Sequence, residues 1–471
     1  MKKILITTPI YYVNDRAHIG HAYTTLAADV LTRFFRERDN NVFFLTGTDE
    51  HGAKVAESAE KAGKSPKKLC DENSKFFKEA WKNLNIKYDH FIRTTDKIHE
   101  ETVKKFLNKL KEKNLIYEKE YQGLYCTECE KFLTERELKN DKCPDHKTKP
   151  KKVSEKNWFF KLNLKTVEEL LKKQLKIGPE RAKSEVLGLL KQGLEDFSVS
   201  RQKQRVKWGI ELPFDKNQTI YVWIDALLNY ITGDGSDNFK KYWKDGYVIH
   251  LLAKDILKFH AIYWPAMLKE VRHKVPDEEF IHGFFTINGQ KISKTLGNII
   301  DPNDLIKKFG TDATRYLLLS QFPFGQDGDV KQSRFAEKYN ADLANGLGNL
   351  VARVLTLAAR INLKASKARP EKEILNRTKQ ARDNYTEYME DFKLFEALEE
   401  IWKLIGFCDS YVDKEKPWQL KDKKKLEQIL SNLLYCIFEI AELITPFLPD
   451  TSEKIKKQLK SGKSEILFPR I

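Results

Sequence analysis

The chain has 471 residues, 41% of them hydrophobic and 32% charged, with a formal net charge of +16. This length exceeds what one compact core fills, so we expect roughly two to four domains, and no apolar run approaches the roughly 20 residues that a membrane span needs. The positive charge favours an anionic partner such as nucleic acid, although a lysine-rich composition alone also produces it.

The N-terminal part of the sequence predicts an α/β unit. Residues 3–10 (KILITTPI) predict a buried strand, residues 20–36 a helix and residues 41–46 (NVFFLT) a second strand. Strand, helix and strand in about 45 residues make a βαβ unit, whose crossover makes the two strands parallel. No small-residue cleavage site follows the first strand, so we expect no signal peptide and a cytoplasmic location.

The middle of the chain predicts an insertion that splits this α/β domain. Residues 115–214 are lysine-rich and cysteine-bearing, with short strands such as 158–162. Apolar stretches at 221–230, 247–252 and 279–288 then predict strands that complete the sheet, with a helix after the second of them.

The last part of the sequence predicts a helical bundle. Apolar residues recur at the i, i+3, i+4, i+7 spacing of a buried helix face at 347–361 and again at 426–444, where Pro446 stops the helix. The expected domains are 1–114 and 215–300 for the two α/β halves, 115–214 for the insertion, 301–345 for a linking region and 346–471 for the helical domain.

The string His18-Ile19-Gly20-His21 stands where the loop after the first strand enters a helix. A helix N-terminus binds anions through its unpaired N–H groups and its dipole, and at the carboxyl edge of a parallel sheet it faces the ligand crevice. Two structural histidines would give the same four letters, so this motif needs a partner.

The partner is Lys291-Ile292-Ser293-Lys294-Thr295, which follows an apolar stretch and a turn at Asn288-Gly289. Two lysines three residues apart on a loop suit the charge that develops on a pyrophosphate leaving group, whereas a solvated loop is the alternative for this string alone. The two motifs together predict a phosphate site made of His18, Gly20, His21, Lys291, Ser293 and Lys294.

Three of the six cysteines cluster in the insertion. Cys126-x-x-Cys129 is followed after thirteen residues by Cys143-x-x-His146, which supplies the four N/S ligands of a closed structural zinc site. The alternative is a loop without metal. Cys70, Cys408 and Cys436 are isolated in helix-like stretches, so we expect them in the core.

Longer strings carry a family resemblance. They are TTPIYYVN at 7–14, GTDEHG at 47–52, YVWIDALLNY at 221–230 and AKDILKFHAIYWPAML at 253–268. With HIGH and KISKT they resemble class I aminoacyl-tRNA synthetases and, within that class, the methionyl-tRNA synthetases. KISKT departs from the family string KMSKS at Ile292 and Thr295, and both changes keep the two charged lysines.

This resemblance implies a ligase that uses ATP with Mg²⁺ to convert L-methionine into its adenylate and then transfers it to tRNA(Met). The implied fold class is α/β, a split Rossmann-type parallel sheet with a zinc-knuckle insertion, followed by a C-terminal α-helical bundle. The implied catalytic residues are His18, His21, Lys291 and Lys294, and the zinc is one structural ion per chain. We expect a monomer that does not engage membranes.

The resemblance also implies the remaining site residues. Asp49 takes the substrate ammonium, and Asp255 binds the ATP ribose. Asn349, Arg353 and Trp418 read the anticodon, where an aromatic ring can stack on an unpaired base. The other methionine-binding residues are Ile10, Tyr12, Trp223, Leu227, Tyr230 and His260.

Each of these residues has a simpler interpretation as an isolated observation. An aromatic residue in a strand is more often core, a carboxylate at a helix start is a cap, and Trp418 after a proline could be buried packing. Two other functions also remain open: another class I synthetase or nucleotidyl transferase, for instance one for cysteine, leucine or valine, and a non-catalytic zinc-containing RNA-binding protein.

Overall fold

The computed structural model describes all residues except 145–146, 292–298 and 332. The chain divides into two compact units. The first, here called the sheet unit, comprises residues 1–17, 39–80 and 87–282, and the second, the helical unit, comprises 18–38, 81–86 and 283–471.

The sheet unit is built on a six-stranded sheet with the strand order β3-β2-β1-β12-β13-β7. All five strand pairs are parallel, which confirms the α/β prediction. The strands are β1 (Lys3–Tyr12), β2 (Asn41–Asp49), β3 (His90–Arg93), β7 (Lys176–Gly178), β12 (Tyr247–Ala253) and β13 (Glu278–His282).

Nearly all residues of the central strands β1 and β12 are buried or partly buried, as in parallel strands that are covered on both faces. Strand β7 comes from the predicted insertion and forms one edge of the sheet, which the short Lys176–Gly178 segment did not reveal. The helices of this part are α2 (Ala53–Lys61), α3 (Pro66–Asn83), α4 (Lys97–Glu112), α5 (Leu164–Lys173), α6 (Glu180–Gln192), α7 (Val222–Leu227), α8 (Asn229–Thr232), α9 (Asp237–Asp245) and α10 (Trp264–Glu270).

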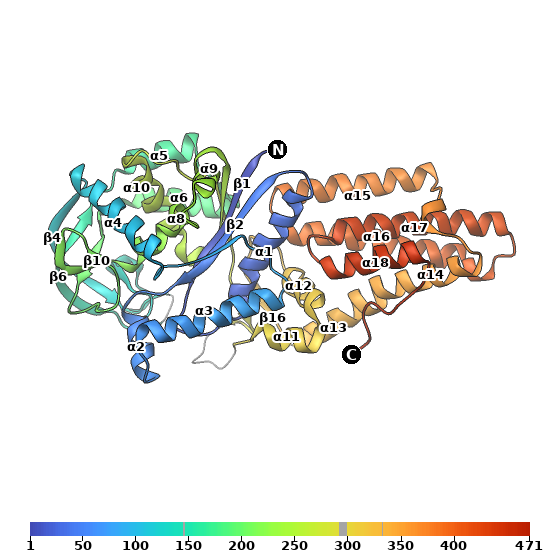
Figure 1. The fold of residues 1–471 in the computed structure, drawn as a ribbon, viewed down its shortest axis with the longest axis horizontal. Coiled ribbons are helices and arrows are strands. Elements are labelled where there is room, and N and C mark those ends of the chain that lie inside the picture. The colour runs from blue at the N-terminus through green and yellow to red at the C-terminus, as the bar shows by residue number, and fades with distance from the viewer. Residues whose placement is uncertain (145–146, 292–298, 332) are drawn as a thin grey trace. The chain divides into compact units, whose positions relative to one another are not determined.

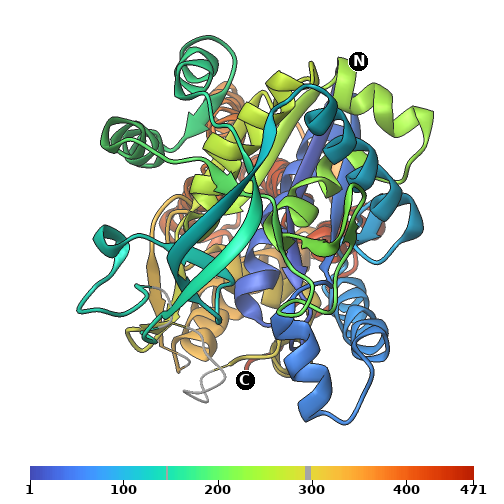
Figure 2. The same ribbon diagram turned by 90° about the vertical axis from the view of Figure 1, so that its left-hand side faces the viewer.

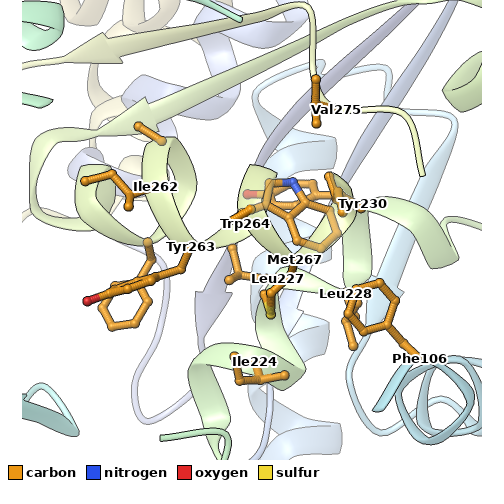
Figure 3. Packing of buried hydrophobic residues seen from close by; sticks show 14 of the residues in the cluster. Phe106, Ile224, Leu227, Leu228, Tyr230, Ile262, Tyr263, Trp264, Met267 and Val275 are labelled. Atoms are coloured by element: carbon orange, nitrogen blue, oxygen red, sulfur yellow. The ribbon is translucent and has the colours of Figure 1, made fainter. Parts of the chain in front are cut away.

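Residues 221–230 are helical, so the prediction of a strand there is wrong. The segment forms α7 and α8, which pack into one apolar cluster with α4 and α10; Figure 3 shows Leu227, Tyr230, Trp264 and Met267 gathered in it. A short apolar run suits a buried helix as well as a buried strand, and periodicity cannot separate the two.

The residues of the predicted insertion include a separate antiparallel sheet, with the order β5-β4-β6-β8. The long β4–β6 ribbon, teal in Figure 2, pairs from Ile116 with Phe160 to Tyr125 with Lys151. Its strands are β4 (Ile116–Cys126), β5 (Lys131–Leu133), β6 (Lys151–Phe160) and β8 (Phe197–Ser198), and a second small sheet contains β9 (Ser200–Gln202), β10 (Glu211–Leu212) and β11 (Asp215–Ile220).

The helical unit contains the predicted bundle. The two apolar repeats lie in α14 (Asn349–Arg360) and α17 (Lys423–Ile444), and the helices α14 to α18 run side by side in Figure 1. The unit also contains α1 (Ile19–Arg36), α11 (Pro302–Phe309), α12 (Thr311–Leu319), α13 (Ser333–Lys338), α15 (Lys372–Glu390), α16 (Leu394–Glu415), α18 (Pro449–Ser461) and the small sheet of β14 (Phe285–Ile287), β15 (Gln290–Lys291) and β16 (Gly328–Val330).

A buried ion pair ties α1 to this unit. Arg315 of α12 lies 2.7 Å from Asp29 of α1, and neither side chain is exposed. The guanidinium also donates to the carbonyls of Leu84, Pro446 and Phe447. Since a buried arginine is tolerated only when its donors are paired, this residue fixes the junction of three chain segments.

Among the described residues, no helix is long and apolar enough to cross a membrane.

Candidate functional site

The HIGH string forms the first turn of α1. His18 is the N-cap in extended conformation, and its Nδ1 accepts from the backbone N–H of Gly20 at 3.1 Å. The backbone N–H of His18 donates in turn to Nδ1 of His21 at 3.3 Å, and the two rings stack with centroids 3.8 Å apart. The two imidazoles thus accept hydrogen bonds from backbone N–H groups at the start of the helix, as in a capping box.

These bonds define the tautomers of the two imidazoles. A ring nitrogen that accepts from a backbone N–H carries no proton, so each ring bears its hydrogen on Nε2. Burial, and next the neighbouring His18, lower the pKa of His21 well below its usual range. At neutral pH His21 is therefore a neutral hydrogen-bond donor and not a cation.

Residues that flank the KISKT loop contact the HIGH helix within the helical unit. The backbone N–H of Ile19 donates to the carbonyl of Ile300 at 3.1 Å, and Tyr23 packs edge-on against Phe285. Asn288 and Gly289 both have positive φ, 51° and 73°, as the predicted turn requires. Ser293 and Lys294 lie outside the described residues, as does the side chain of Lys291.

Three predicted ligand residues lie at the carboxyl edge of the sheet. Tyr12 ends β1 and stands in register with Asp49, which ends β2. Asp255 follows β12 in a 3-10 turn and is exposed. Because β2, β1 and β12 are adjacent and parallel, these residues share the edge where open α/β sheets bind ligands.

Asp49 has a buried carboxylate oxygen that accepts no hydrogen bond from the part of the chain that the structure describes. The carboxyl group does accept a hydrogen bond from the backbone N–H of His51. Burial, and then the nearby carboxylates of Asp225 and Glu130, raise the pKa of Asp49 well above its usual range. A buried anion with one unpaired oxygen is costly unless a cationic ligand completes it.

Aromatic side chains of the same unit pack against one another, and Trp223, Phe259, Tyr230 and His260 are here called the aromatic wall. Trp223 of α7 stacks on Phe259, with centroids 4.3 Å apart and planes 7° apart. The Tyr230 hydroxyl lies 2.9 Å from Nε2 of His260, whose Nδ1 lies 3.0 Å from the carbonyl of Ile256. Leu227 is buried in the core cluster, and Ile10 and Tyr12 pack against that cluster.

The polar atoms of Tyr230, His260 and Tyr12 form hydrogen bonds with other groups of the protein. Nδ1–H of His260 donates to the Ile256 carbonyl, which leaves Nε2 to accept from Tyr230. Burial lowers the pKa of His260 to about 4, so the ring is neutral at pH 7. The Tyr12 hydroxyl donates to Glu130 at 2.9 Å. The rings therefore present carbon surfaces, which suit a thioether.

The motifs and spacings of the sequence did not predict a buried network near Asp49. Asp225 accepts from Nδ1 of His51 at 2.7 Å and from Nε2 of His99 at 2.8 Å, and all three residues are buried. Although burial alone would raise it, the two histidines lower the pKa of Asp225 to about 2. Asp225 and His51 stand inside the strings 221–230 and 47–52, but no spacing rule pairs residues 174 positions apart.

The sulfur atoms of Cys126, Cys129 and Cys143 all lie within 4.8 Å of one another, and those of Cys129 and Cys143 are 3.8 Å apart. Two sulfurs bound to a tetrahedral zinc at about 2.3 Å are separated by about 3.8 Å, so the described ligands fit this ion. His146 lies outside the described residues.

The other three cysteines are buried. Cys70 lies in α3, Cys408 in α16 and Cys436 in α17, which confirms that they are core residues.

The three predicted anticodon residues lie in the helical bundle. Asn349 and Arg353 are one turn apart on α14. The Arg353 guanidinium lies 5.6 Å from the ring centroid of Trp418 and 3.1 Å from Asp413. Trp418 is 46% exposed, so it is not the buried packing residue that its place after a proline could also have meant. An exposed aromatic beside a guanidinium suits base stacking.

Comparison with known proteins identifies the chain's relatives. Residues 4–153 and 135–355 match the family of class I tRNA synthetases (M), and residues 371–469 match the anticodon-binding domain of tRNA ligases. The methionine-tRNA ligase of Caldanaerobacter subterraneus subsp. tengcongensis is 42% identical over 100% of this chain and 79% of its own length. That of Thermotoga maritima is 41% identical over 97% of this chain and 75% of its own length.

A solved structure has the same fold. Mycobacterium tuberculosis methionyl-tRNA synthetase in complex with methionyl-adenylate superposes with a TM-score of 0.90 and 33% identity, covering 100% of both chains. The parallel sheet with its flanking motifs, the helical bundle and these matches together show that the chain belongs to the methionine-tRNA ligase family of class I aminoacyl-tRNA synthetases.

Proposed function

We propose that the protein activates L-methionine with ATP to methionyl-adenylate and pyrophosphate, and then transfers the methionyl group to tRNA(Met). Asp49 carries this proposal most directly, because it stands in register with Tyr12 and has a buried oxygen that the described residues leave without a hydrogen bond. The α-ammonium of an amino acid is a cation that would pair with it. Family membership and the aromatic wall of Trp223, Tyr230 and His260 then select methionine.

We propose that ATP is held by residues from both sequence motifs. His18 and His21 donate their Nε2–H groups to phosphate oxygens, and the backbone at Gly20 belongs to the same helix N-terminus. Lys291, Ser293 and Lys294 stabilise the departing pyrophosphate, and Asp255 binds the ribose. Mg²⁺ enters with ATP and offsets phosphate charge. No protein nucleophile is needed, because positioning and charge stabilisation lower the barrier.

We assign one structural zinc to Cys126, Cys129, Cys143 and His146. Three thiolates and one imidazole would supply four protein ligands, so the ion would organise the insertion and would leave no open position for catalysis.

Metal analysis is expected to find about one zinc per chain, and Cys143→Ser is expected to lower that content, because a hydroxyl is a poor zinc ligand. The same variant should impair tRNA charging more than the far-ultraviolet circular dichroism of the protein. Cys436→Ser is the matched control, since this thiol is buried in α17 outside the cluster, and its zinc content should equal the wild type. A fully active, metal-free wild-type protein would contradict the assignment.

Trp418→Ala is expected to weaken tRNA charging by about 10- to 100-fold while methionine-dependent exchange is unchanged. Stacking on an unpaired base contributes roughly 1 to 3 kcal/mol, and the half-exposed ring is not needed for the core. The measurement compares kcat/KM for tRNA with the ATP–pyrophosphate exchange rate, and Trp418→Phe should keep most of the charging. Equal losses in both assays would instead make Trp418 a folding residue.

The decisive test of the proposed function is ATP–pyrophosphate exchange measured with each amino acid in turn. We expect exchange with methionine, and not with cysteine, leucine or valine at the same concentration. Exchange with none of them would favour a non-catalytic RNA-binding protein. We further propose that the enzyme works in the cytoplasm as a monomer, with the domain boundaries at residues 114, 214, 300 and 345.

A further inference from the structure

We infer that Glu130 is a positioning residue for the methionine pocket, whose buried carboxylate fixes both the Tyr12 hydroxyl and the start of helix α2. This inference rests on the proposed function, and neither sequence motif includes the residue. Glu130 follows Cys129 directly, so it stands in the turn of the cysteine cluster. Its side chain nevertheless belongs to the amino-acid site.

Glu130 is 4% exposed, and three donors of the described residues bond its carboxylate. One oxygen accepts from the Tyr12 hydroxyl at 2.9 Å, and the other accepts from the backbone N–H of Lys54 at 2.9 Å. The backbone N–H of Ala53 bonds it as well. Within the part of the chain that the structure describes, these partners are all donors, which suits an ionised carboxylate, since it accepts through both oxygens and donates nothing.

Glu130 also replaces the missing cap of α2. Gly52 is the N-cap of this helix and has no side chain to bond its first N–H groups. The Glu130 carboxylate, 76 positions from Lys54, bonds them from across the fold and places negative charge at the positive end of the helix. The string 47–52 therefore leads from Asp49 directly into a helix start that Glu130 holds.

The contact between Glu130 and Tyr12 leaves no room for a side chain at position 52. A Cβ at Gly52 would lie 2.5 Å from a carboxylate oxygen of Glu130 and 2.5 Å from the Tyr12 hydroxyl. Gly52 also has φ of +113°, a conformation that side chains disfavour. Glu130 itself has a positive φ of 50°, which for a residue other than glycine costs free energy and needs support from its contacts.

The neighbours of Glu130 contact the same site. The carbonyl of Cys129 accepts from Nε1 of Trp223 at 3.3 Å, and Lys131 donates to the carbonyl of Asp255 at 2.8 Å. The carbonyl of Glu130 accepts from the Tyr221 hydroxyl. Three consecutive residues thus bond segments that carry the proposed methionine and ribose residues.

Glu130→Gln keeps the shape of the side chain and tests its charge. A glutamine can accept through one oxygen only, so its NH₂ group must face either the Tyr12 hydroxyl or a backbone N–H. Facing Tyr12, it would turn the hydroxyl proton away from residue 130. We expect the KM for methionine in the exchange assay to rise about 10-fold, while the KM for ATP and the zinc content stay at wild-type values.

A double-mutant cycle with Tyr12→Phe shows whether Glu130 acts through Tyr12. Without the hydroxyl the mismatch disappears, so Glu130→Gln should have a much smaller effect in the Tyr12→Phe background than alone. Glu128→Gln is the matched control, since this carboxylate lies in the same turn but is 38% exposed and bonds the Lys54 ammonium. Its methionine KM should equal the wild type.

Three outcomes would overturn the inference: an unchanged methionine KM in Glu130→Gln, additive effects in the cycle, or a loss of zinc that accompanies the loss of methionine affinity. The last would mean that the carboxylate only supports the fold of the insertion. Failure of the proposed function is distinguishable from these, because the wild-type protein itself would then show no methionine-dependent exchange.

Discussion

Lys294→Ala is expected to lower the rate of methionyl-adenylate formation by about 100-fold or more, with little change in methionine affinity. The ammonium would meet charge that develops on pyrophosphate only in the transition state, and one such donor typically contributes about 3 to 4 kcal/mol. Stopped-flow or exchange kinetics give the rate, and equilibrium dialysis with methionine gives the affinity.

Lys294→Arg provides the control for this experiment, because it keeps the charge and loses only the geometry of the ammonium. It should keep more activity than the alanine variant. If methionine affinity collapses together with the rate in Lys294→Ala, the lysine supports the site's fold and the assigned role is wrong.

Asp49→Asn is expected to weaken methionine binding by about 100-fold or more and at the same time to stabilise the free protein at neutral pH. The amide cannot pair with the substrate ammonium, and loss of one partner from a buried charge pair costs about 3 kcal/mol. It also removes a buried charge that the described residues leave partly unpaired. Calorimetric titration with methionine and thermal unfolding of the free protein measure the two effects.

The pH dependence of methionine binding separates this role from a structural one. Burial raises the pKa of Asp49, so the carboxylate is protonated at pH values where an exposed aspartate is ionised. Methionine affinity of the wild type should therefore fall as the pH is lowered through this raised pKa. In the free protein the sign is opposite, because stability is lost as the pH rises through it. Asp49→Asn should flatten both curves, and an unchanged pH profile would contradict the assignment.

Local sequence patterns were sufficient to predict the motifs and the elements with strong periodicity. The βαβ start, the two bundle helices and the turn at Asn288-Gly289 follow from local patterns, since hydrophobic spacing and turn residues act over a few positions. The CxxC…CxxH spacing predicted the cysteine cluster, because paired ligands two residues apart are typical of a zinc site. The family resemblance added the roles of Asp49, Trp223 and the other pocket residues, which no local pattern could supply.

The conformation of residues 221–230 and the partners of the buried polar groups depend on packing in the folded chain. Residues 221–230 became helices because a short apolar run is compatible with either buried element, and packing chose between them. The pairing of Asp225 with His51 and His99, and the contact of Glu130 with Tyr12, join residues far apart in the chain. A buried carboxylate must find donors wherever the fold provides them, and its partners are therefore set by the folded chain and not by sequence spacing.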